Sequence, residues 1–294
     1  MNIGTQIRRI RTGREVRLSR SKAGTFFIFL FLALLCAFMF LPVLYAILQS
    51  VKPIEEYYIF PPRFFVQNPT FQNYSNIMLL ADNLWVPFSR YVLNTLIVTV
   101  CGTVIYVLLS IMAGYSLAKS GMRWMSAIVF LMVVGMLFNS NAVYLVQYLV
   151  VLKLGLIDTY PAMILPMIAT TMGVFLMRQF ISSNISDEML EAARIDGAGE
   201  FTILFKIVTP GVKAGWLTIT IFQFLAFWNN ANSAFTFSEN LKQVPAVIGS
   251  IATGSLARAG SGSAVVVISM IPPLIVFIWS QRSIMDTMAH SGLK

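Results

Sequence analysis

The sequence predicts an all-α, polytopic membrane protein with six transmembrane helices, because the chain is hydrophobic, poor in charge and divided into long charge-free stretches. Of its 294 residues, 57% are hydrophobic and 11% are charged, and the mean hydropathy is +0.76. A soluble domain carries about 25% charged residues, so this composition argues against a soluble enzyme. It also excludes a disordered chain, since disordered chains are poor in apolar residues and rich in charge.

Six charge-free stretches are each long enough to cross a hydrocarbon core about 30 Å thick at about 1.5 Å per residue. A charge at the centre of a span costs about 2.5–3.5 kcal/mol, so charged residues mark the ends of these stretches. Barrel strands would be about 10 residues long with alternating polarity, whereas these runs are longer and apolar all round. The predicted spans are 23–51 (between Lys22 and Lys52), 91–118 (Arg90 and Lys119), 124–152 (Arg123 and Lys153), 159–177 (Asp158 and Arg178), 214–238 (Lys213 and Glu239) and 259–281 (Arg258 and Arg282).

One further charge-free stretch, residues 64–81, is predicted to stay outside the membrane. It contains three Asn, two Gln and a Pro, and amides buried in lipid would lack hydrogen-bond partners. We expect an extramembrane loop there, with a short helix near its end.

The distribution of basic residues predicts that both termini lie in the cytoplasm. Residues 1–22 hold seven basic residues and a single acidic one, and this orientation puts 15 of the 21 basic residues inside, as the positive-inside rule requires. We interpret the net charge of +9 as this topology signal rather than as a nucleic-acid-binding surface. The expected domains are a basic cytoplasmic tail (1–22), a transmembrane domain (23–282) and a cytoplasmic C-terminal tail (283–294).

The sequence lacks the residues of common catalytic and nucleotide-binding sites. Its single histidine, His290, lies near the C-terminus, and Cys36 and Cys101 fall inside predicted spans. Neither an HExxH or CxxC metal motif nor a GxSxG nucleophile elbow occurs. Without a GxxxxGK[ST] loop, the chain cannot cradle nucleotide phosphates in the P-loop manner. We therefore expect no catalytic residue, metal or cofactor on this chain.

The six predicted spans contain no Asp, Glu or His, which disfavours a proton-coupled carrier. They do contain uncharged polar side chains, and amides and hydroxyls suit a neutral solute that is rich in hydroxyl groups. The alternative for each is an interhelical hydrogen bond, typically worth about 0.6 kcal/mol. These polar residues are Asn94, Asn139, Ser140, Asn141, Gln147, Gln223, Asn229 and Asn230.

The segment 182–213, between the fourth and fifth predicted spans, has the pattern of a surface helix. It is about 30 residues long, far more than a short connection needs. Asn184 or Ser186 can cap the N-terminus of the helix, and Asp187 and Glu188 follow where the helix dipole favours anions.

The same helix is predicted to carry a small, apolar face formed by Leu190, Ala193 and Gly197. Gly197 opens a Gly-Ala-Gly stretch that can end the helix through a residue with positive φ. A second helix is expected from about Glu200 to near Pro210. A surface helix with a small-residue face is suited to docking into a groove of a partner protein.

This segment resembles the EAA loop of ABC-importer permeases, which contains Glu191-Ala192-Ala193, Gly197, Ile207 and Pro210 in this order. The string EAARIDGAGEF looks like the carbohydrate-importer branch, in particular the maltose-type second permease. Thr209 and Ser186 depart from the usual Leu and the common Pro. Further similar landmarks are Ser50-Val51-Lys52-Pro53 with Glu55 and Glu56, the segment 69–74 (PTFQNY), Asn94-Thr95-Leu96, and the segment 155–160 (GLIDTY).

The resemblance implies a subunit that forms half of the translocation path of an ATP-driven, binding-protein-dependent importer for a sugar or oligosaccharide. The implied partners are a second, homologous permease, a dimer of ATP-binding subunits that holds ATP and Mg²⁺, and an extracytoplasmic solute-binding protein. The helix in the coupling loop 183–210 would dock on the ATPase; the alternative for Arg194 and Asp196 is an internal loop pair. The implied docking residues are Glu191, Ala192, Ala193, Arg194, Asp196 and Gly197.

On the outer side, the resemblance implies that loops 52–88 and 236–258 receive the binding protein. The segment 242–249 is similar to a loop that some sugar permeases insert toward it, with Gln243, Val244 and Pro245 as contact residues. Sugar binding often combines aromatic stacking with amide hydrogen bonds. The residues expected to line the substrate path are therefore Asn94, Asn141, Gln223, Trp228, Asn229 and Asn230.

The expected location is the cytoplasmic (inner) membrane of a bacterium. The first alternative is an importer for a non-sugar solute. A stand-alone secondary carrier is a second alternative, against which the long EAA loop and the lack of carboxylates in the spans argue.

Overall fold

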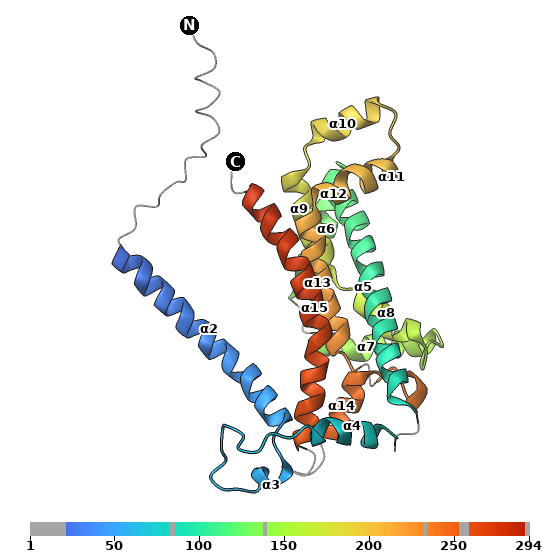
Figure 1. The fold of residues 1–294 in the computed structure, drawn as a ribbon. Helices are drawn as coiled ribbons and strands as arrows, with labels where there is room; N and C mark the ends of the chain where they lie inside the picture. Colours follow the sequence, from blue (N-terminus) through green and yellow to red (C-terminus); the bar gives the residue numbers. More distant parts are fainter. Residues whose placement is uncertain (1–21, 83–85, 138–139, 232–233, 253–258, 292–294) are drawn as a thin grey trace. The chain divides into compact units, whose positions relative to one another are not determined.

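The computed structural model describes residues 22–82, 86–137, 140–231, 234–252 and 259–291, and all regular structure in these ranges is helical (Figure 1). The all-α prediction is confirmed for this part of the chain. Two compact units are present, residues 1–46 and 47–294. The helices are α2 (Lys22–Ser50), α3 (Ile54–Tyr57), α4 (Gln72–Asp82), α5 (Phe88–Lys119), α6 (Met125–Met136), α7 (Ser140–Lys153), α8 (Tyr160–Ile168), α9 (Thr171–Asn184), α10 (Asp187–Ile195), α11 (Glu200–Ile203), the π-helix η1 (Leu204–Val208), α12 (Thr209–Gly211), α13 (Lys213–Asn229), the 3₁₀-helix η2 (Glu239–Leu241), α14 (Val244–Ala252) and α15 (Ala259–Ser291).

The described part of the first unit is α2 up to Ala46; this apolar helix continues to Ser50 and matches the predicted span 23–51. It is 29 residues long, and its side chains from Ala23 to Pro42 are all exposed. A helix that is apolar on every side suits a lipid environment. The prediction of a first membrane-spanning helix is therefore confirmed in length and composition.

In the second unit, α5 is the central helix and packs against α9, α13 and α8. It matches the predicted span 91–118. Its approach to α9 is close because Gly114 faces that helix. A Cβ atom at Gly114 would lie 2.8 Å from Cβ of Met177 and 2.9 Å from the backbone nitrogen of Arg178. Glycines at such crossings let two membrane helices pack backbone to backbone.

The predicted span 159–177 is not one straight helix. It is a pair, α8 and α9, bent by 48° and continuing to Asn184. α8 contains Pro166, which has no backbone N–H to donate. The chain then leaves the helical conformation at Thr170, where ψ is 134°.

Two other predicted spans also differ from the structure. The prediction that the fifth span reaches residue 238 is wrong, because α13 ends at Asn229 and Asn230 is extended with ψ of 122°. The stretch 124–152 forms two short helices, α6 and α7, separated in part by Phe138 and Asn139, which lie outside the described residues. The described part of the chain thus holds three helices long and apolar enough to cross a membrane, or four if α8 and α9 form one span.

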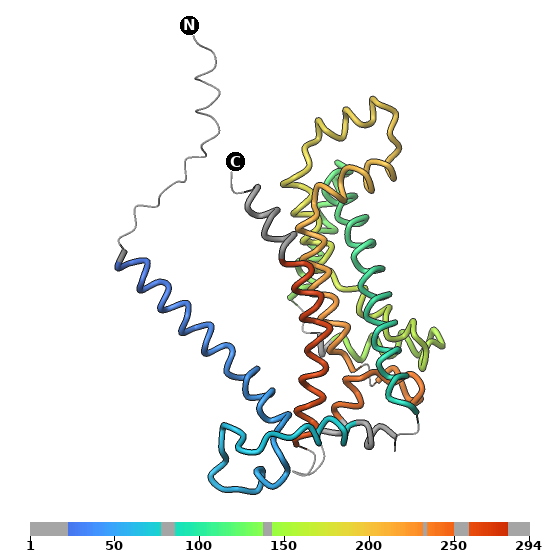
Figure 2. The backbone as a smooth tube through the Cα atoms, in the orientation of Figure 1, coloured from blue at the N-terminus to red at the C-terminus, as the bar shows by residue number. Residues whose placement is uncertain are grey.

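Four of the shorter helices of the second unit lie at its two ends. α10 and α11 lie at one end, and α4 and α14 lie at the opposite end (Figure 1), as the backbone trace in Figure 2 also shows. The position of α4 confirms the prediction of a short helix near the end of the stretch 64–81.

The largest apolar core lies at the α10 end and includes residues from the segment 185–208. This segment is therefore an integral part of the bundle rather than a free connection. The fully or nearly fully buried residues of this core are Tyr106, Ile111, Met177, Ile181, Ile185, Leu190, Ile203, Leu204, Val208, Val212 and Ile219.

Replacing Gly114 by Val should destabilise the protein by about 1–3 kcal/mol, the usual cost of overpacking a tight contact. The reason is that the new side chain would collide with backbone atoms of α9 that cannot rotate away. The measurement is the thermal unfolding midpoint in detergent. Gly135→Val in α6 is the matched control, since a Cβ there meets no atom within 4 Å. Equal midpoints for the two variants would contradict the close α5–α9 contact.

Candidate functional site

The helix predicted from residues 184–197 is present as α10, with both of its expected end signals. The Oγ of Ser186 accepts a hydrogen bond from the backbone nitrogen of Met189 at 3.4 Å. At the other end, Gly197 has a φ of +80°. The backbone nitrogens of Gly197 and Ala198 donate to the carbonyls of Arg194 and Ala193, each at 3.0 Å. This is the Schellman pattern that a glycine after a helix permits.

Two of the three residues of the small, apolar face of α10 point into the protein, whereas Gly197 is exposed at the end of the helix. Leu190 is 1% exposed, and Ala193 packs against the same core. The opposite side of the helix carries Glu191 and Ala192, both exposed, and Ile195, which is 86% exposed. The surface available to a partner is therefore this second face.

Two apolar side chains on that surface were missed by the sequence reasoning. Ile195 and Phe201, which is 71% exposed, both project from the loop at the tip of the bundle. The sequence does contain a signal for Ile195. It lies five positions after Leu190 and therefore on the opposite side of the helix from Leu190 and Ala193.

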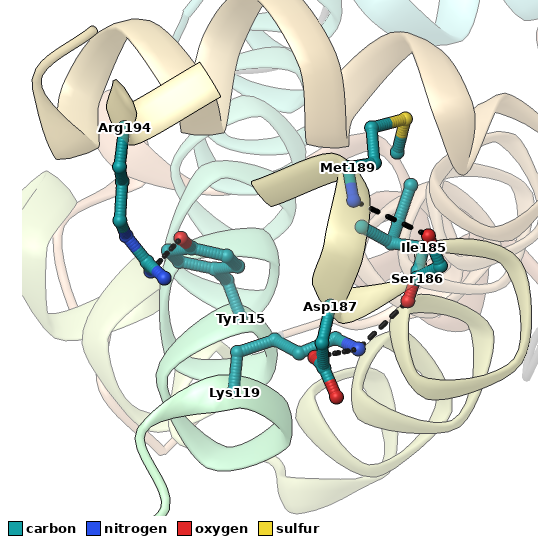
Figure 3. Close-up of polar contacts among 7 residues, drawn as sticks. All are labelled: Tyr115, Lys119, Ile185, Ser186, Asp187, Met189 and Arg194. Carbon is teal, nitrogen blue, oxygen red and sulfur yellow. Dashed lines mark hydrogen bonds and ion pairs between the residues drawn. The ribbon is translucent and has the colours of Figure 1, made fainter. Parts of the chain in front are cut away.

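A buried lysine ties the beginning of α10 to the last turn of α5 (Figure 3). The Nζ atom of Lys119 lies 2.7 Å from Oδ1 of Asp187 and donates to the carbonyl of Ile185, also at 2.7 Å. The side chain of Lys119 is only 9% exposed, whereas that of Asp187 is largely exposed. The lysine thus satisfies one backbone carbonyl and one carboxylate at the point where the chain enters α10.

The end of α10 is tied to the same turn of α5 by a second polar cluster. Arg194 donates from Nε to Oε1 of Glu200 at 2.8 Å, and Tyr115 donates from its hydroxyl to Oε2 at 2.7 Å. Hydrogen bonds from Arg194 and then Tyr115 hold the pKa of Glu200 below its usual value, and Glu200 in turn raises the pKa of Arg194. Arg194 therefore forms an ion pair within the loop, and its partner is Glu200.

Three of the residues expected on a substrate path donate hydrogen bonds to backbone carbonyls of other segments. Gln223 donates to the carbonyl of Met167 in the last turn of α8, at 3.0 Å. Trp228 donates from Nε1 to the carbonyl of Ser269 at 2.9 Å. That carbonyl has no helical donor four residues later, because residue 273 is a proline.

Asn94 is the third such residue and uses all of its amide groups within the protein. Its Nδ2 donates to the carbonyls of Asn240 at 2.8 Å and Lys242 at 3.0 Å, and its Oδ1 accepts from the hydroxyl of Tyr160 at 2.8 Å. The side chain is completely buried. In this structure Asn94 orders the loop around η2.

The remaining residues expected on the path are Asn229, Asn230 and Asn141. Asn230 contacts the sulfur of Met167 at 3.1 Å, close to Trp228, whose ring stacks on Phe224 with centroids 6.0 Å apart. Asn229 is exposed and donates to the carbonyl of Leu225 one turn earlier. Asn141 lies in α7, and its side chain is outside the part that the structure describes.

The three expected binding-protein contacts lie at the opposite end from α10. Gln243 is fully buried, Val244 is nearly so, and Pro245 is half-buried. The backbone nitrogen of Val244 donates to Oγ1 of Thr95 at 2.9 Å. In this conformation the exposed neighbours available to a partner include Asn240 rather than Gln243.

Asp158, which the sequence places at the boundary of a predicted span and within the landmark segment 155–160, organises the adjoining loop. It adopts a φ of 64°. Its Oδ1 accepts from the backbone nitrogens of Phe237 at 3.0 Å and Ser238 at 2.9 Å, and its Oδ2 accepts from the Ser238 hydroxyl. Bonds from Ser238 lower the pKa of Asp158. Within the described ranges, no group of three or more His, Cys, Asp or Glu could hold a metal ion.

Comparisons with known proteins extend over this whole bundle. A family model described as "Binding-protein-dependent transport system inner membrane component" matches residues 80–289. A polygalacturonan/rhamnogalacturonan transport system permease protein of Bacillus subtilis is 28% identical over 270 residues, covering 86% of this chain and 91% of the relative. An arabinooligosaccharides transport system permease protein of Halalkalibacterium halodurans is 29% identical over 281 residues, covering 90% and 94%.

The fold is also found among solved structures. A chain from the crystal structure of a bacterial ABC transporter involved in the import of the acidic polysaccharide alginate matches with a TM-score of 0.71 and 25% identity. The match covers 90% of this chain and 98% of the other. The architecture described above is therefore that of an importer subunit of known fold.

Replacing Gly197 by Ala should cost about 1–2 kcal/mol in the stability of α10, because an L-residue is strained in the left-handed region. Gly199→Ala is the matched control, since Gly199 has a φ of −71° and, like Gly197, open space around its Cβ position. Hydrogen exchange of the amides in α10 measures the difference. Equal exchange in both variants would contradict the Schellman end.

Replacing Trp228 by Phe should lower stability by about 1–3 kcal/mol, because the partly buried carbonyl of Ser269 would be left without a donor. The second substitution Pro273→Ala should restore much of this loss, since it supplies a backbone N–H to that carbonyl. Trp279→Phe, at an exposed position of α15, is the control. Thermal unfolding in detergent gives the comparison. A Trp228→Phe protein that is as stable as the parent but transports poorly would assign Trp228 to the substrate instead.

Proposed function

This chain belongs to the family of binding-protein-dependent transport system inner membrane components, and we propose that it is one of two membrane-spanning subunits of an ATP-driven importer for a sugar or oligosaccharide. The observation that carries the proposal is the family match, which extends over residues 80–289 and includes the whole coupling loop. The similarity to permeases for polygalacturonan/rhamnogalacturonan and arabinooligosaccharides, and to an importer of the acidic polysaccharide alginate, supports the choice of substrate class.

The proposed topology has six spans, with both termini in the cytoplasm. α2, α5 and α15 would be single spans, α8 and α9 together a bent span, and α13 a shorter one. The stretch formed by α6 and α7 would complete the set. The excess of basic residues at the N-terminus supports this orientation, which puts α10 on the cytoplasmic side.

The proposed partners are a second, homologous permease, a dimer of ATP-binding subunits and an extracytoplasmic solute-binding protein. ATP and Mg²⁺ would be held by the ATP-binding subunits, since this chain has no P-loop. In the proposed cycle, ATP closes the nucleotide-binding subunits, the coupling helices move with them, and the two permeases alternate between inward and outward access. This chain would itself be non-catalytic.

We propose that α10 contacts the ATPase through its exposed face. Glu191 and Ala192 are exposed there, and Asp196 and Gly197 follow at the exposed end of the helix. Ile195 adds the most exposed apolar side chain of the loop. Ala193 and Arg194 would act indirectly, because Ala193 packs inward and Arg194 bonds Glu200.

On the substrate side, Asn229 is the exposed amide of the proposed path. Sugar contacts by Asn94, Gln223, Trp228 and Asn230 would need a conformation in which their present bonds open. Asn141 remains a candidate on sequence grounds. Contact with the binding protein through the loop around Gln243, Val244 and Pro245 would likewise use exposed neighbours such as Asn240 first. An importer for a non-sugar solute is the alternative within the same fold.

The test is co-purification from the native membrane of the parent chain and of an Ala192→Trp variant. We expect the parent to recover a P-loop ATPase and a second permease, and the variant to lose the ATPase but keep the permease. Ala127→Trp, at an exposed position of α6, is the matched control and should recover both. A chain that purifies alone and transports by itself in liposomes would overturn the proposal in favour of a secondary carrier.

A further inference from the structure

α5 differs from the other described long helices because it is continuous and contacts the loops at both ends of the bundle. It has 32 residues without a proline, which corresponds to a length of about 48 Å. By contrast, α15 contains Pro272 and Pro273, and α8 and α9 meet at a 48° bend. α13 has only 17 residues. Among these, α5 is thus the helix best suited to move as one rigid element.

At the α10 end, a single turn of α5 holds both ends of the coupling helix (Figure 3). Tyr115 and Lys119 are four residues apart and therefore lie on one face of α5. Lys119 bonds Asp187 at the start of α10, and Tyr115 bonds Glu200 just after its end. The guanidinium of Arg194 also reaches the Tyr115 hydroxyl, at 3.4 Å. A helix held at both ends to one turn cannot tilt or shift without moving that turn or breaking these bonds.

At the opposite end, the first turns of α5 hold the segment 239–244 in the same way. Asn94 bonds the carbonyls of Asn240 and Lys242, and Thr95 accepts from the backbone nitrogen of Val244. The hydroxyl of Tyr91 donates to Glu239 at 3.2 Å. Asn94 and Thr95 are both completely buried, so water does not compete for these hydrogen bonds.

We propose that α5 transmits movement between residues 185–200 of the coupling loop and residues 239–244 of the outer loop 236–258, with Tyr115 and Lys119 as positioning residues at one end and Asn94 and Thr95 at the other. This inference rests on the proposed function, in which the first loop meets the ATPase and the second lies on the side of the binding protein. Displacement of α10 by the ATPase would shift α5 along or about its axis, and the outer loop would follow.

The experiment follows the outer loop while ATP acts on the inner one. The complex that co-purifies with this chain is prepared with Cys36 and Cys101 replaced by Ala and with Asn240→Cys as the only reactive thiol on this chain. The side chain of Asn240 is exposed, and only its carbonyl takes part in the bonds to α5. The rate of modification by a maleimide is measured with and without MgATP and vanadate, and the ratio of the two rates is the readout.

In the parent we expect MgATP and vanadate to change the modification rate at residue 240 by at least about fivefold. When α5 is disconnected at either end, the ratio of the two rates should move toward one. At the inner end the test is Tyr115→Phe with Lys119→Met, and Lys119→Arg should keep the response because it preserves both donors. At the outer end the test is Asn94→Leu with Thr95→Val, which removes the bonds of both residues to the segment 239–244, and Thr95→Ser alone should keep the response. Lys213→Met, an exposed lysine at the start of α13, is the control.

The double variant Asn94→Leu, Thr95→Val leaves the coupling loop untouched, so its result does not depend on whether the inner variant still binds the ATPase. A parent-like ratio in this double variant, with the ATPase present and active, would overturn the inference. A parent in which the ATPase is recovered but residue 240 shows no response would overturn it as well, while the proposed function would stand. A parent that recovers no ATPase would instead overturn the proposed function.

Discussion

Within an apolar bundle, every backbone group that is not bonded inside a helix needs a partner from the same protein. The break between α8 and α9 shows how this chain meets that constraint. The backbone nitrogen of Gly173, in the first turn of α9, donates to the hydroxyl of Tyr106 at 2.7 Å. The carbonyl of Met167, in the last turn of α8, accepts from Gln223. Side chains from α5 and α13 therefore stabilise the bend. The same hydrogen bonds hold α5 against α9 and α13 against α8.

The same constraint explains why so many polar residues of the spans face the protein. Trp228 supplies the donor that Pro273 cannot supply, and Asn94 satisfies two carbonyls of the outer loop. Lys119 does the same for the carbonyl of Ile185 at the other end of α5. Polar residues used in this way hold elements in register, and a substrate path through this conformation would rely first on groups that remain exposed, such as Asn229.

The coupling loop illustrates how far local sequence signals reach. Ser186, the acidic first turn and Gly197 mark the ends of α10 correctly, because capping depends on neighbouring residues only. Which face of α10 packs against the bundle could not be predicted from the capping residues. Leu190 and Ile195 are both apolar, and only the position of the α9–α13 core decides that Leu190 is buried and Ile195 is exposed.

The sequence by itself determined the membrane class, the helices α2, α5 and α15 and the presence of α10, since hydrophobic length and helix caps are local properties. It also carried the family resemblance that the comparisons confirm. The tertiary structure alone decided where spans bend or end, which face of α10 is free and which carbonyl each buried amide satisfies. These depend on contacts between residues far apart in the chain, such as Tyr115 with Glu200 and Asn94 with Asn240, which no local pattern encodes.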